Sequence, residues 1–143
     1  MTGSDFIAVA IQLLTTDNEA RLRSAVSRAY YGAFHDVREF VESLGVAVPR
    51  YDVHDKLWWC LRQAGERDAV LAGNALNVLR SDRNAADYNL KARLFTRDVV
   101  RVKVELAVKV VDLVDLCRGE PLRSRLHASI RPYAANVLKW PIA

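Results

Sequence analysis

The sequence predicts an all-α protein: an up-and-down bundle of four to five helices, followed by a short basic C-terminal helix. Apolar residues recur at steps of three and four along several stretches, and no alternating apolar-polar run bounded by turn residues is found. Hydrophobic residues make up 51% of the 143 residues, which is enough for one core. We therefore expect a helical bundle over residues 1–120 and a basic extension over residues 121–143.

The first two helices are predicted in the first third of the chain. A short helix covers residues 5–14, with Ser4 as its cap. A long helix follows, because one apolar stripe runs from Leu22 to Leu44. Asp17 or Asn18 caps its start, and Gly45 ends it in a left-handed conformation.

Three further helices follow. The third begins after Asp52 and ends at Gly65. The fourth begins near Asp68 and is expected to weaken over residues 83–90, where Asn, Asp and Tyr cluster. The fifth begins at Thr96 and runs to Cys117, before a Gly-Glu-Pro stop signal.

The fifth helix has two apolar stripes, which indicates either a central position or a face buried against a second subunit. The stripes leave both alternatives open, and a homodimer is one of them. One stripe is Val99, Val102, Leu106, Val110, Leu113 and Cys117, and the other is Val100, Val104, Val108 and Val111. After it, a short basic helix is predicted over residues 122–138, interrupted at Pro132.

The net charge of +4 lies in residues 118–143, and a second basic enrichment covers residues 80–103. Such an excess either attracts a phosphate backbone or is a solvated arginine-rich surface. No apolar stretch is long enough for a membrane span, and the N-terminus does not resemble a signal peptide. Cys60 and Cys117 are too isolated for a disulfide framework or a zinc site. We expect a cytoplasmic protein with no metal and no cofactor.

Two segments carry side chains suited to chemistry. On the long helix, a polar row with helical spacing contains Arg28, Tyr31, His35, Arg38 and Glu42. This row either faces solvent or meets a partner or cleft. In the second segment, Arg83 and Asp87 are spaced to form a helical ion pair, and Arg83 is also suited to bind a phosphate with its planar fork of donors.

Both segments resemble the signatures of small prokaryotic HEPN-domain proteins. Residues 27–35 read Ser-Arg-Ala-Tyr-Tyr-Gly-Ala-Phe-His, which looks like the family's S-R-A-Y-Y-x-x-F-H signature. Residues 83–88 read Arg-Asn-Ala-Ala-Asp-Tyr, which looks like its R-x-x-A-D-Y signature. The two occur in the expected order, and the resemblance covers roughly residues 5–118.

The resemblance implies a helical bundle that dimerises and acts on RNA. Many HEPN proteins are metal-independent ribonucleases or toxins, often paired with a nucleotidyltransferase-type antitoxin. In catalytic members an Arg holds the scissile phosphate, and a His that follows it closely helps to activate the ribose 2′-hydroxyl. Here no His follows Arg80 or Arg83 before His127, and Asp87 lies near the position expected for the His.

One arrangement restores the missing imidazole. In this hypothesis, His35 lies next to Arg83 and Asp87, either from the facing helix or from the other subunit. These three residues are the candidate catalytic group. The alternative is that His35 and Tyr88 satisfy each other inside the bundle. The candidate residues for nucleic-acid binding are Arg80, Arg83, Arg93, Tyr31 and Tyr88, and the resemblance also makes Tyr88 a candidate for nucleotidylation.

Three functions stay open from the sequence. The first is an RNA-cleaving HEPN protein, as an endoribonuclease or the toxin of a toxin–antitoxin pair. The second is a non-catalytic HEPN module that binds a nucleotide, RNA or a partner nucleotidyltransferase. The third is a structural dimer without contact to nucleic acid.

Overall fold

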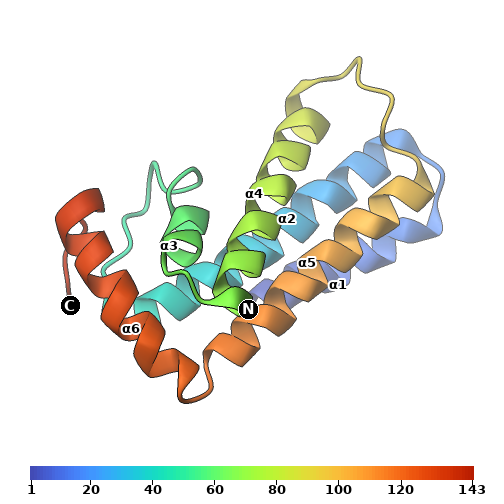
Figure 1. Ribbon diagram of the computed structural model, residues 1–143. Helices are drawn as coiled ribbons and strands as arrows, with labels where there is room; N and C mark the ends of the chain where they lie inside the picture. Colours follow the sequence, from blue (N-terminus) through green and yellow to red (C-terminus); the bar gives the residue numbers. More distant parts are fainter.

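The computed structural model describes all 143 residues. Its helices pack together and it has no strand (Figure 1), so the all-α prediction is confirmed. None of the helices combines the length and the apolar character needed to cross a bilayer. The helices are α1 (Gly3–Gln12), α2 (Glu19–Ser43), α3 (Leu57–Gln63), α4 (Arg67–Tyr88), α5 (Arg97–Cys117) and α6 (Leu122–Tyr133). A 3₁₀ turn, η1 (Leu13–Thr15), follows α1, and a π-helical turn, η2 (Ala134–Leu138), follows α6.

The central element is α2, which packs against α1, α4 and α5. Every apolar residue of its predicted stripe, from Leu22 to Leu44, is buried. Asn18 caps the helix by accepting a hydrogen bond from the Arg21 N–H at 3.1 Å. Gly45 ends it with a φ of +85°, as predicted, because glycine adopts this conformation without steric cost. In Figure 1, α4 and α5 lie in front of α1 and α2.

The first helix begins earlier than predicted. Thr2 is its N-cap residue, not Ser4, and its backbone N–H donates to the Asp5 carboxylate at 2.6 Å. The Asp5 carboxylate thus satisfies the free N–H of Thr2, so the helix begins before the start expected at residue 5. The end also differs, because Leu13–Thr15 forms the 3₁₀ turn.

The expected weakening of the fourth helix is wrong: α4 continues through Arg83 and Asp87 to Tyr88. Two features keep it helical. Arg83 and Ala86 are buried against the rest of the bundle. The guanidinium of Arg23 on α2 donates to the carbonyls of Ala86 and Asn89, both at 2.9 Å, so the end of the helix is capped from outside.

Helix α5 begins after Thr96 and ends at Cys117, as predicted. Its buried face differs from both predicted stripes and combines parts of each. The buried residues are Val100, Val104, Ala107, Val110, Leu113, Val114 and Cys117, whereas Val99 and Val102 are exposed.

The C-terminal extension packs back onto the end of α2. The predicted interruption at Pro132 is wrong, since α6 runs on to Tyr133 before the π-helical turn. Arg123 and Arg131 donate to the carbonyls of Ser43 and Leu44, at 2.9 and 3.0 Å. These two cations therefore satisfy the C-terminal carbonyls of α2.

The last residues pair with the segment that follows α2. Trp140 is 5% exposed, and an isolated antiparallel bridge joins Val46 to Ile142. The N–H of Ala143 donates to the Gly45 carbonyl at 2.7 Å. The first residues of the segment between α2 and α3 are thus held by the extension.

Candidate functional site

The Tyr-Tyr segment of α2 and the Arg-Asp-Tyr segment of α4 lie side by side. The guanidinium carbon of Arg83 is 5.3 Å from the ring centroid of Tyr30 and 5.5 Å from that of Tyr31. The Ser27 hydroxyl on α2 donates to the Asp87 carboxylate on α4 at 3.3 Å. Residues from both sequence motifs therefore form one polar cluster.

Arg83 is the buried cation of this cluster. Arg83 is 9% exposed, and its Nε has no hydrogen-bond partner. Its closest carboxylate oxygen, on Asp87, is 4.0 Å away, so the predicted helical pair exists but is long. A buried guanidinium usually has its donors satisfied. Arg83 thus retains donor capacity that an anion is suited to satisfy.

The imidazole beside Arg83 is that of His54, in the turn before α3. Its Nδ1 lies 2.7 Å from the Tyr30 hydroxyl, and its ring stacks on Phe34 with a centroid distance of 4.4 Å. Burial lowers the pKa of His54, and the positive charges of Arg83 and Arg80 lower it further. The ring is therefore neutral at neutral pH.

Tyr30 joins His54 to Arg83. Burial raises the pKa of Tyr30, so the phenol stays protonated. Its hydroxyl lies 2.7 Å from His54 Nδ1 and is also hydrogen-bonded to the Arg83 side chain. A neutral imidazole has one N–H donor and one acceptor nitrogen. In the tautomer whose Nδ1 accepts from the phenol, His54 donates from Nε2.

His35 and Arg83 are both neighbours of the Tyr31 ring. Its ring stacks on Phe6 of α1, with a centroid distance of 5.2 Å, and is 6.3 Å from the Tyr31 ring. No hydrogen bond or ion pair joins it to Arg83 or Asp87. Burial lowers its pKa, and Arg38 lowers it further. Of the candidate catalytic group, Arg83 and Asp87 form a long ion pair. His54, which the sequence did not single out, is hydrogen-bonded to Tyr30 beside Arg83.

The other candidate binding residues spread along α4 and the loop after it. Arg80 is half-buried and donates to the Asn77 side chain at 3.0 Å. Tyr31 is half-buried in the cluster, whereas Tyr88 is 76% exposed and has no ring contact. The cluster thus includes Arg80 and Tyr31 but not Tyr88.

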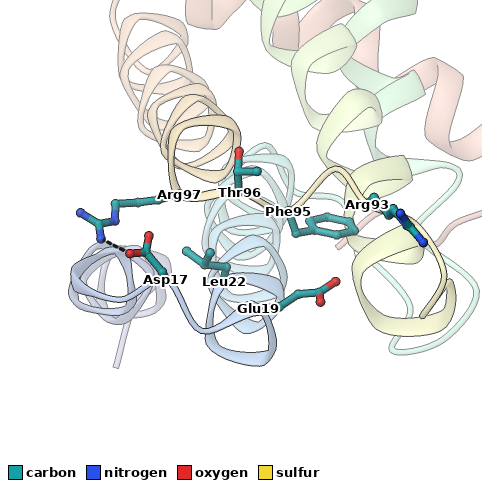
Figure 2. A pocket seen from close by; sticks show the side chains of 7 residues that line it. All are labelled: Asp17, Glu19, Leu22, Arg93, Phe95, Thr96 and Arg97. Carbon is teal, nitrogen blue, oxygen red and sulfur yellow. Dashed lines mark ion pairs between the residues drawn. The ribbon is translucent and has the colours of Figure 1, made fainter.

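Arg93 lies in a separate pocket of about 460 Å³ at the starts of α2 and α5. Figure 2 shows Leu22 and Phe95 between two charged sides of this pocket. On one side Arg97 pairs with Asp17 at 2.9 Å; on the other, Arg93 and Glu19 extend from the loop and from α2. Arg93 has no ion pair, so it is a free cation, and no residue of the Arg83 cluster lines its pocket.

Both cysteines are buried free thiols. Burial raises the pKa of Cys60 to about 12 and that of Cys117 to about 11, so both thiols stay protonated and unreactive. No group of three or more His, Cys, Asp or Glu side chains is placed to hold a metal ion.

Comparison of this chain with protein-family models, curated proteins and solved structures gave no match.

Proposed function

We propose that this protein binds RNA, with Arg83 and His54 donating hydrogen bonds to a backbone phosphate. The observation that carries the proposal is the buried, incompletely paired Arg83 guanidinium beside a neutral imidazole. Guanidinium and imidazole N–H groups are strong donors to phosphate oxygens. The adjacent Tyr31 ring gives a surface on which an RNA base stacks. The resemblance to HEPN-domain proteins supports RNA as the ligand.

Binding of a fluorescent single-stranded RNA, followed by anisotropy, tests this proposal. We expect Arg83→Gln to weaken binding about tenfold or more, because one charged hydrogen bond contributes about 1.5–3 kcal/mol. His54→Gln should weaken it less, since it removes a neutral donor. Arg67→Gln is the matched control: it lies on the same helix, is exposed and has no ion pair. Circular dichroism verifies that each variant is folded.

The salt dependence gives a second readout of the same experiment. Loss of one phosphate contact lowers the slope of log K against log salt by about 0.7 for single-stranded RNA. The slope should fall in Arg83→Gln and stay unchanged in Arg67→Gln. Equal affinity of wild type and Arg83→Gln, with equal slopes, would remove Arg83 from the site and refute the proposal.

Metal-independent cleavage is the second candidate function. A titratable imidazole beside a phosphate-binding guanidinium is the pair of groups that the HEPN resemblance assigns to RNA cleavage. The test is incubation of labelled RNA with EDTA and analysis of the product ends. A 2′,3′-cyclic phosphate whose formation is lost in both Arg83→Gln and His54→Gln supports an endoribonuclease. Binding without cleavage supports the non-catalytic module instead.

We also propose that the chain forms an up-and-down bundle that pairs as a homodimer through α4 and α5. Both helices carry large apolar side chains on an uncovered face, and such patches mark interaction sites. The exposed residues are Leu71 and Val78 on α4 and Val99 and Val102 on α5. A nucleotidyltransferase-type partner would instead find Tyr88 accessible at the end of α4.

A further inference from the structure

A second pocket lies between α1 and α2, next to His35. It has a volume of about 390 Å³, within the range of about 300–1,000 Å³ usual for small-molecule sites. Phe6 and His35, stacked at 5.2 Å, form its aromatic part. Three polar side chains of α2 and the first three residues of the chain complete the lining, namely Arg38, Glu39, Glu42, Met1, Thr2 and Gly3.

The charges in this pocket leave one carboxylate free. Arg38 donates to Glu42 at 2.9 Å and to the Val48 carbonyl at 2.9 Å, so both side chains of this pair are engaged. Glu39 has no hydrogen bond or ion pair and is exposed. Its two oxygens accept hydrogen bonds only. The ligand edge that fits them carries two adjacent N–H donors.

The pocket is connected to the Arg83 cluster by a row of rings. The Tyr31 ring lies 6.3 Å from His35, and Arg83 lies 5.5 Å from the same ring. The guanidinium carbon of Arg28 lies near two of these rings, 5.6 Å from the centroid of Phe6 and 5.9 Å from that of Tyr31. A phosphate at Arg83 and a base in the pocket are therefore within reach of one short RNA segment.

We infer that this pocket is a base-recognition subsite for guanine in single-stranded RNA. The base packs against the stacked Phe6–His35 pair, and the Glu39 carboxylate accepts the N1–H and the N2 amino group of its Watson–Crick edge. Guanine is the base whose edge presents these two adjacent donors, whereas adenine and cytosine present one amino group beside an acceptor. This inference rests on the proposed function, since it assigns specificity to the same RNA.

The test compares RNA oligomers that differ at one base. Oligouridylates with a single central guanosine, inosine or adenosine are titrated against the full chain by anisotropy. We expect guanosine to bind about tenfold more tightly than adenosine, because a two-point base contact gives at least this discrimination. Inosine lacks the N2 amino group and should lie between them. Glu39→Gln should abolish the preference but keep the affinity for plain oligouridylate.

Glu105→Gln on α5 is the matched control, because Glu105 is also exposed and unpaired. An NMR titration with guanosine monophosphate gives a readout that does not need the phosphate site: the His35 resonances should shift and those of His127 should not. Binding that depends on Arg83 but is equal for all bases, with no His35 shift, overturns the inference and leaves the proposed function intact. Absence of RNA binding by wild type overturns both.

Discussion

Arg83 is a buried cation whose neighbours are mainly aromatic rings. Its guanidinium lies over the rings of Tyr30 and Tyr31 and forms a long ion pair with Asp87. The Asp87 carboxylate also accepts a hydrogen bond from Ser27. Cation–π contacts offset part of the desolvation of the guanidinium but do not satisfy its N–H donors. The residue is therefore held in one place and keeps its hydrogen-bonding capacity, which is what a phosphate-binding group requires.

The two half-buried histidines make stability depend on pH. Burial lowers the pKa of His35 and of His54, so between these lowered values and about 6.5 the unfolded chain binds more protons than the folded one. Stability should therefore fall as the pH falls from 7.5 to 5.5. Thermal unfolding at both pH values checks this, and the loss should be smaller in His54→Gln. His127→Gln, at an exposed position, should behave like wild type.

Some residues of the Arg83 cluster could be predicted from the sequence. The spacing of Arg83 and Asp87 predicts their pair, and the two motifs predict that Tyr31 and Arg83 lie near each other. The sequence did not predict His54 as a site residue, because no motif lies next to it. Its contact with Tyr30 depends on the conformation of the preceding segment, in which Asp52 has a φ of +57°. The signal available was Tyr30, because a tyrosine that is buried in the core needs a hydrogen-bond partner for its hydroxyl.

Close approach of α1 and α2 depends on two facing glycines. A Cβ at Gly32 would lie 2.5 Å from Ile7 Cγ1 and 2.7 Å from the Gly3 carbonyl oxygen. The second contact is with backbone, which cannot rotate away. Gly32 therefore lets α1 pack directly on the helix that carries Tyr31 and His35.

Gly32→Ala should lower the free energy of unfolding by about 1–3 kcal/mol, the usual cost of overpacking. Urea unfolding measures it. Gly119→Ala is the control, because a Cβ there would meet only the Leu116 carbonyl oxygen at an ordinary 3.6 Å. That variant should stay within about 0.5 kcal/mol of wild type. Equal stability of the two variants would mean that α1 is less tightly packed than described.

Helix positions followed from periodicity, whereas helix ends depended on distant contacts. The stripe of α2, its Asn18 cap and Gly45 are local features, and the sequence contains them. The end of α4 was predicted wrongly because its cap is Arg23, more than 60 residues away in the chain. Which face of α5 is buried also depended on its neighbours, since both of its faces are apolar.

The uncovered face of α4 and α5 predicts a homodimer at the level of the whole molecule. Light scattering after gel filtration should give twice the chain mass of 16.1 kDa. Val78→Glu should give a monomer, because burying a carboxylate in this face is unfavourable. Val9→Glu on α1 is the matched control, since Val9 is 43% exposed and Val78 is 46% exposed. A monomeric wild type, or a dimeric Val78→Glu, would contradict the assigned interface.

The pairing of residues 141–143 with the segment after α2 links two distant parts of the chain. That segment leads directly to His54, so its path to the Arg83 cluster is anchored by the Ala143–Gly45 and Ala47–Pro141 hydrogen bonds. An insertion between positions 45 and 47 would break this pairing unless the carboxyl-terminal residues shifted with it. In homologous chains these two regions should therefore vary in length together, while α2 and α4 keep a constant register.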